Sequence, residues 1–239
     1  MIKANDNNSI IRRFGTIEGV FLPALLSILG VIMYLRLAWV VGNVGIGGAL
    51  LIIGLAKAIT ISTGLSVSSL ATNVHVERGG AYSIIAKSLG IEAGGAIGIP
   101  LYLAQTLSTV FYILGFTEGL YMVIPADSIL QDHPNKILVS LAVWLALQFL
   151  CYRSTRLTLK LQYIIAVAIF ASLVSLFLGS GDEITEVKLW GSTACGDVGF
   201  WTVYAIFFPA VTGILAGIGM SGELKDPKKS LPIGTLAAI

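Results

Sequence analysis

The chain has 239 residues, of which 56% are hydrophobic and only 12% are charged, and its formal net charge at pH 7 is +2. Its mean hydropathy is +0.88. Soluble domains contain about 25% charged residues, so this composition excludes an ordinary soluble domain and indicates an integral membrane protein. No nucleic-acid partner is expected.

Six apolar runs are long enough to span a bilayer, for which a helix needs about 20 residues. They lie at residues 20–41, 49–71, 94–116, 136–152, 161–179 and 200–220. A seventh run begins at Leu231 and stops with the chain, which predicts the front part of a longer protein, truncated after its sixth helix. The stretches "VHVERGGAYSIIAKSLG" and "GELKDPKKS" are expected to form tight connections between spans.

Lysine and arginine are concentrated on one side of the predicted spans, the pattern that marks the cytoplasmic side. Only Lys136 and Lys188 lie on the opposite side, where the loops instead hold Asp127, Asp132, Asp182, Glu183, Glu186 and Asp197. The basic side holds Lys3, Arg12, Arg13, Arg78, Lys87, Arg153, Arg156, Lys160, Lys225, Lys228 and Lys229. The sequence therefore predicts a multi-pass membrane protein with a cytoplasmic amino terminus.

Cysteine and histidine are too few and too far apart for a cofactor or metal site. Cys151 and Cys195 are separated by a predicted span, so they indicate no disulfide framework. His75 and His133 lie in loops on opposite sides of the membrane. We expect no cofactor, no metal beyond monovalent cations, and no enzymatic activity.

Helix-breaking residues crowd the sixth run, "FFPAVTGILAGIGM" from Phe207. Pro209 removes a backbone donor and clashes with the preceding turn, at a cost of about 3 kcal/mol in a helix interior. Phe208, before the proline, is disfavoured in helical dihedrals, whereas Gly213 tolerates almost any. These residues predict a break across residues 208–213; the alternative is a simple proline kink.

The first run, "ALLSILGVIMYLRLAW", also carries a polar residue and a glycine near its middle, Ser27 and Gly30. Unpaired backbone within a membrane must be buried in protein or line a wet cavity, and in the sixth run Thr212 offers a local hydroxyl. The first and sixth spans are five helices apart. This is the spacing expected of a five-helix unit repeated in inverted orientation, with broken helices at matching positions, as in transporters.

A broken span exposes backbone groups of opposite partial charge inside the membrane. One half would begin with free amides, at Gly30, Val31 and Ile32 in the first span and at Gly213, Ile214 and Leu215 in the sixth, which suit an anion. The other half would finish with carbonyls near Ser27 and before Pro209, which suit a dehydrated monovalent cation with the hydroxyls of Ser27 and Thr212. Bound together, the two ions would offset part of each other's desolvation cost.

Several motifs resemble the cation-chloride cotransporters of the amino acid-polyamine-organocation superfamily, from about Gly15 to the end of the chain. They are "ILGVIMYLRLAWVVG", "GLSVSSLATN", "RGGAYSIIAKSLG", "YILGFTE" and "FFPAVTGILAGIGMSGELKDPKKSLPIGT". The resemblance implies an all-α membrane fold, the front part of an inverted-repeat transporter of five plus five helices. Residues 1–19 would form a cytoplasmic segment, residues 20–179 the first repeat, and residues 180–239 the start of the second.

The resemblance also implies ion ligands. The potassium site would use Ser27, Ile28, Tyr112, Pro209 and Thr212. The two chloride sites would use Gly30, Val31 and Ile32, and Gly213, Ile214 and Leu215. Tyr112 favours the potassium-transporting members, although these usually have asparagine at the position of Ser27.

Other roles follow from the same resemblance. Leu26 and Leu29 would supply only the first-helix part of a sodium site, so sodium coupling stays open. Arg36 and Glu118 would pair as an extracellular gate; independent snorkelling of each is the alternative. Lys57, inside the second span, has no counterpart in the family pattern.

The predicted function is secondary active cotransport of chloride with potassium, electroneutral and by alternating access. The alternatives are an amino acid or polyamine transporter of the same fold, and an inactive fragment or non-transporting subunit. The expected partners are chloride, potassium and the lipid bilayer, with sodium and a homodimer left open.

Overall fold

A computed structural model describes residues 13–74, 79–124, 133–153, 155–179, 188–191 and 198–239. These residues are helical or irregular apart from one isolated bridge between Phe14 and Leu224, which confirms the predicted all-α fold. Five helical segments among them are long and apolar enough to cross a membrane. They are Ile17–Asn73, Ile91–Val123, Asn135–Arg153, Leu157–Leu178 and Phe200–Glu223.

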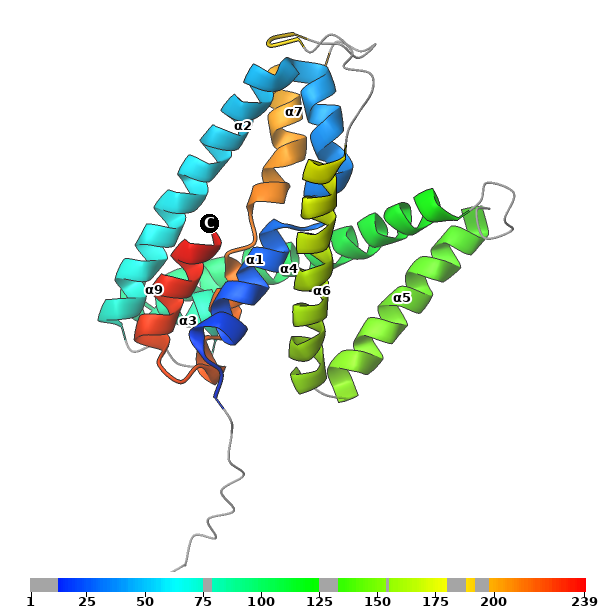
Figure 1. The fold of residues 1–239 in the computed structure, drawn as a ribbon. Helices are drawn as coiled ribbons and strands as arrows, with labels where there is room; N and C mark the ends of the chain where they lie inside the picture. Colours follow the sequence, from blue (N-terminus) through cyan, green and yellow to red (C-terminus); the bar gives the residue numbers. More distant parts are fainter. Residues whose placement is uncertain (1–12, 75–78, 125–132, 154, 180–187, 192–197) are drawn as a thin grey trace, which may run out of the picture.

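The first of these segments is long enough to cross a membrane twice. It has 57 residues, which as one straight helix would extend roughly 85 Å, against about 30 Å for the bilayer core. It comprises a π-helical turn (η1, Ile17–Phe21), α1 (Leu22–Ile28) and α2 (Val31–Asn73). Gly45 interrupts α2 with a φ of 75°, and Figure 1 shows α2 doubling back. The first two predicted spans therefore exist, joined by a sharp bend instead of a loop.

A short segment before the sixth span covers this bend. The amide of Ile46 donates to the carbonyl of Lys188 at 3.2 Å, and the amide of Gly47 donates to that of Leu189 at 2.8 Å. A Cβ on Gly45 would lie 2.8 Å from the Leu189 oxygen. Glycine is thus required here both for the positive φ and for the close approach.

The connection after the second span is more ordered than the sequence suggested. Part of "VHVERGGAYSIIAKSLG" forms α3 (Gly80–Leu89), which starts and ends at glycines with positive φ, Gly79 and Gly90. Gly94 of the next helix faces Ala86, and a Cβ there would lie 2.6 Å from that of Ala86. The prediction of a plain connection was wrong, because the apolar positions of this stretch pack α3 against the following helix.

The third, fourth and fifth spans are α4 (Ile91–Val123), α5 (His133–Arg153) and α6 (Thr155–Leu178). The sixth span comprises α7 (Phe200–Phe207), a 3₁₀ turn (η3, Phe208–Val211), α8 (Leu215–Gly219) and a second 3₁₀ turn (η4, Ser221–Glu223). The seventh helix is α9 (Pro227–Ala238). Figure 1 shows α5 and α6 running in opposite directions, close together at their connected ends and diverging towards the other ends. Large apolar side chains cover the exposed faces of α4, α5 and α6, as expected of helices in contact with lipid.

The buried core surrounds the first and sixth spans. One apolar cluster joins α2 to α7 and η3, with Ile52 and Val203 fully buried. A smaller cluster joins Ala24 and Ile28 of α1 to Ile214 and Ala238. The two interrupted spans therefore pack directly on each other at the level of their interruptions.

Candidate functional site

The first span is broken where the sequence predicted. Helix α1 ends at Ile28, Leu29 leaves the helix with a ψ of 35°, and Gly30 is extended with a ψ of 174°. A Cβ on Gly30 would lie 3.0 Å from the Ser27 carbonyl oxygen and 3.0 Å from the ring of Tyr112. The glycine therefore lets α4 approach the broken backbone.

The break in the sixth span is narrower than predicted. Phe208 keeps helical dihedrals, with φ −49° and ψ −42°, and begins the 3₁₀ turn, so the prediction that it leaves the helix was wrong. A 3₁₀ turn keeps the chain coiled around Pro209 and overrides the dihedral preference of the preceding residue. The open part is confined to Thr212, which is extended, and Gly213, whose φ is +136°.

Hydroxyl groups satisfy the carbonyls freed by this break. Thr212 Oγ1 donates to the carbonyl of Pro209 at 2.8 Å, which confirms Thr212 as a local partner. Thr60 of α2 is buried, and its hydroxyl lies 3.0 Å from the carbonyl of Ala56 in its own helix and 3.3 Å from the carbonyl of Val211, so the two carbonyls share one proton. Thr60 was not predicted, because its contact with the sixth span joins residues that are 151 positions apart.

The two breaks meet. A Cβ on Gly213 would lie 2.8 Å from the Cβ of Ser27 and 3.1 Å from the Ile28 nitrogen. The phenolic hydroxyl of Tyr112 donates to the Ser27 carbonyl at 3.2 Å and so joins α4 to the first break. The structure thus brings together Ser27, Ile28, Tyr112 and Gly213, from three separate spans.

A cavity of about 340 Å³ lies between these elements. Among the predicted ion ligands, it is lined by Ser27, Tyr112, Thr212, Gly213, Ile214 and Leu215. Its polar lining also includes four residues that were not predicted: Thr60, Thr63, Gln105 and Ser108. Gln105, Ser108 and Tyr112 are spaced by three and four residues, so they share one face of α4. This polar stripe in an apolar span is the signal that could have identified them.

The remaining predicted cation ligands lie close by. Pro209 stands on the 3₁₀ turn, and its carbonyl accepts both the amide of Thr212, at 3.3 Å, and the Thr212 hydroxyl. Leu26 lies in the last turn of α1, and Leu29 forms the turn that follows.

The first set of amides lies on a different cavity. Gly30 precedes α2, so it and the next two residues belong to the helix start, where amides lack intrahelical partners. Val31 and Ile32 line a cavity of about 220 Å³ with Arg36 and Glu118. Along α4, this cavity contacts Phe111 to Glu118, whereas the larger cavity contacts Ala104 to Tyr112. The two amide sets therefore open onto successive cavities.

Two charged side chains meet across the second cavity. The Arg36 guanidinium is 3.6 Å from the Glu118 carboxylate, and the two side chains are 45% and 48% exposed. This geometry fits the predicted pair better than independent snorkelling, although a half-exposed pair contributes little stability.

Lys57, which the sequence left unexplained, has a partner. Its ammonium donates to the backbone carbonyl of Ile239, at the end of α9, at 2.7 Å. Among the residues that the structure describes, no group of three or more His, Cys, Asp or Glu side chains could hold a metal ion.

Comparisons with known proteins agree with this architecture. A family model described as amino acid permease matches residues 19–239. Solute carrier family 12 member 1 of Rattus norvegicus is 35% identical over 255 aligned residues, which cover 99% of this chain and 23% of that protein. Solute carrier family 12 member 2 of Homo sapiens is 36% identical over 95% of this chain and 20% of that protein. Member 8 of Mus musculus is 31% identical over 95% of this chain and 33% of that protein.

The chain thus spans 20% to 33% of the length of these relatives. Their similarity confirms the predicted resemblance to the cation-chloride cotransporters. Since the family model covers nearly the whole chain, the chain belongs to the amino acid permease family.

Proposed function

We propose that the protein is a secondary active cotransporter that couples chloride to potassium by electroneutral alternating access, and that it is a transporter and not an enzyme. One observation carries the proposal. The same cavity is lined by Ser27, Tyr112 and Thr212 and by Gly213, Ile214 and Leu215, and the Tyr112 hydroxyl bonds to the Ser27 carbonyl. The residues proposed to bind the cation and those proposed to bind the anion therefore lie side by side at two helix breaks.

The proposed potassium ion binds among the oxygens of Ser27, Ile28, Tyr112, Pro209 and Thr212. Two of these carbonyls already accept hydroxyl protons, Ser27 from Tyr112 and Pro209 from Thr212. A hydroxyl that donates away from the cavity keeps lone pairs for a cation. A cation could bind the two carbonyl oxygens only if the hydroxyl protons rotated away from them. Until then, the two hydrogen bonds stabilise the empty site.

Chloride is proposed to bind at both amide sets. The first is Gly30, Val31 and Ile32, of which Val31 and Ile32 line the smaller cavity, and the second is Gly213, Ile214 and Leu215 on the larger one. Joint movement of a cation and chloride carries no net charge. It avoids about 2.3 kcal/mol per charge for each 100 mV of membrane potential. Coupling requires that the protein change sides readily when fully loaded or empty and poorly when partly loaded.

Further parts of the proposal extend beyond the ion cavity. Arg36 and Glu118 act as the outer gate, and the carbonyls of Leu26 and Leu29 contribute to a sodium site if sodium is carried. Residues 20–179 form the first repeat and residues 180–239 begin the second, after an amino-terminal segment (residues 1–19) in the cytoplasm, of which residues 1–12 lie outside the described part. The proposed partners besides the ions are the lipid bilayer and a second copy of this chain in a homodimer.

The alternative substrate is an amino acid or polyamine. The family model's description favours it, and a cavity of about 340 Å³ could hold a small amino acid, with its carboxylate on the free amides. The compact first break, in which only Leu29 and Gly30 leave the helix, gives less room for a carboxylate than for chloride.

Rubidium uptake into proteoliposomes tests the proposal. We expect uptake of radiolabelled rubidium to depend on chloride and to persist when the membrane potential is clamped at zero. Uptake that is unchanged when gluconate replaces chloride would contradict cotransport. Amino acid uptake without rubidium uptake would favour the alternative, and no uptake of either would indicate an inactive fragment.

A further inference from the structure

Lys136 occupies an unusual position for a lysine. It is one of two on the side of the membrane where lysines are scarce, and it lies in the first turns of α5. Its ammonium lies 5.2 Å from the ring centroid of Tyr121 on α4. Within the described ranges, Lys136 forms no ion pair, since Arg36 with Glu118 is the pair found there.

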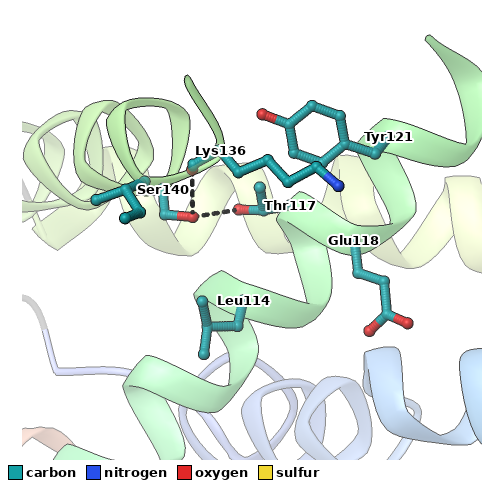
Figure 2. Close-up of a pocket in the computed structure, with 7 residues that line it drawn as sticks. Leu114, Thr117, Glu118, Tyr121, Lys136 and Ser140 are labelled. Carbon is teal, nitrogen blue, oxygen red and sulfur yellow. Dashed lines mark hydrogen bonds between the residues drawn. The ribbon is translucent and has the colours of Figure 1, made fainter. Parts of the chain in front are cut away.

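Lys136 lines a cavity of about 370 Å³ between α4 and α5 (Figure 2). Its lining comprises Leu114, Thr117, Glu118 and Tyr121 of α4 and Lys136, Ile137 and Ser140 of α5. Ser140 Oγ lies 3.3 Å from Thr117 Oγ1 and 3.0 Å from the Lys136 carbonyl. These contacts fix the start of α5 against α4 and hold the Lys136 backbone beside the cavity.

Glu118 lines both this cavity and the smaller one that contains Arg36. Figure 2 shows its carboxylate turned away from Lys136, where it pairs with Arg36. Glu118 and Tyr121 are three residues apart on one helix, so their Cβ atoms are about 5–6 Å apart. The Lys136 ammonium over the Tyr121 ring is therefore within reach of a different Glu118 rotamer.

We propose that Lys136 is the second partner of Glu118 and accepts its carboxylate when the pair with Arg36 separates. The proposal rests on the proposed gating role of Arg36 and Glu118. Without Lys136, opening would leave the half-exposed Glu118 carboxylate without a charged partner, beside the apolar side chains of Leu114 and Ile137. In exchange, Lys136 gives up only a weak attraction to an aromatic ring. Lys136 thus stabilises the open outer gate.

Accessibility of the cavity below the gate tests this role. In the reconstituted protein, Cys151 and Cys195 are replaced by serine. Leu35 lines the cavity that contains Arg36, so the cysteine introduced by Leu35→Cys becomes accessible to a thiol reagent when the gate opens. A neutral, membrane-impermeant polyethylene-glycol maleimide is the probe, so that electrostatic attraction does not affect its arrival. We expect Lys136→Gln to slow labelling about three- to five-fold, the factor that corresponds to a partly exposed ion pair. Lys136→Arg should keep the parent rate.

Two controls separate the pair from a general charge effect. Lys188→Gln removes the other lysine of the same side and should not change the labelling rate. In a Glu118→Gln background, Lys136→Gln should have no further effect. An unchanged rate in Lys136→Gln, an equal slowing in Lys188→Gln, or a full effect without Glu118 would each overturn the proposal. Labelling needs no ion gradient, so absent rubidium uptake with the expected labelling pattern would contradict cotransport alone.

Discussion

The hydroxyl of Tyr112 donates a hydrogen bond to the carbonyl of Ser27 at 3.2 Å, and so joins the third span to the break in the first. The carbonyl accepts this bond because the break at Leu29 and Gly30 removes the next helical turn above it. Tyr112 also lines the larger cavity. One side chain therefore both stabilises the empty site and faces its proposed cation.

Replacing Tyr112 by phenylalanine removes the hydroxyl and keeps the ring against Gly30. We expect the apparent affinity for rubidium to fall about tenfold, because a hydrogen-bonding group that contacts a charge contributes about 1.5–3 kcal/mol. Concentration dependence of rubidium uptake measures the effect. Tyr102→Phe, an exposed tyrosine of the same helix, is the matched control. Equal rubidium affinities in the two variants would place the cation elsewhere.

Gly213→Ala should damage the site through the backbone. Its φ of +136° is unfavourable for any side chain, and the added Cβ would lie 2.8 Å from that of Ser27. Strained backbone positions of this kind cost about 1–3 kcal/mol, so we expect a lower melting temperature in detergent and loss of chloride-dependent uptake. Gly219→Ala, in the same span but with no neighbouring atom within 4 Å of the added Cβ, should behave like the parent. A fully active Gly213→Ala protein would show that the breaks need not touch.

Thr60 offers a test of how the sixth-span break is stabilised. Thr60→Val keeps the shape and removes the hydroxyl, which lies 3.0 Å from the Ala56 carbonyl and 3.3 Å from the Val211 carbonyl. A buried carbonyl left without a partner costs about 1–3 kcal/mol. We expect a lower melting temperature for Thr60→Val and near-parent behaviour for Thr60→Ser, which retains the hydroxyl. If valine and serine melt alike, the Thr60 contact does not support the break.

The sequence predicted both breaks because their causes are local. Proline and glycine act on their own backbone, so Gly30 and Gly213 could be identified without a structure. The response of the chain was harder to predict, since the 3₁₀ turn from Phe208 depends on packing between α7, η3 and α2. Long-range partners such as Thr60 with Val211 and Lys57 with Ile239 had no local signature.

The Arg36–Glu118 pair was predicted from the family resemblance and not from an interaction energy. Reversing the two charges tests the pair directly. Arg36→Glu places two carboxylates where the structure has groups 3.6 Å apart, so their repulsion should hold the gate open. We expect labelling of Leu35→Cys to rise about three-fold or more, within the range of a half-exposed pair. The double exchange, Arg36→Glu with Glu118→Arg, should return labelling towards the parent rate. Lys188→Glu controls for added negative charge on the same side. Independent snorkelling predicts instead that the double exchange brings no recovery, because neither side chain would then depend on the other.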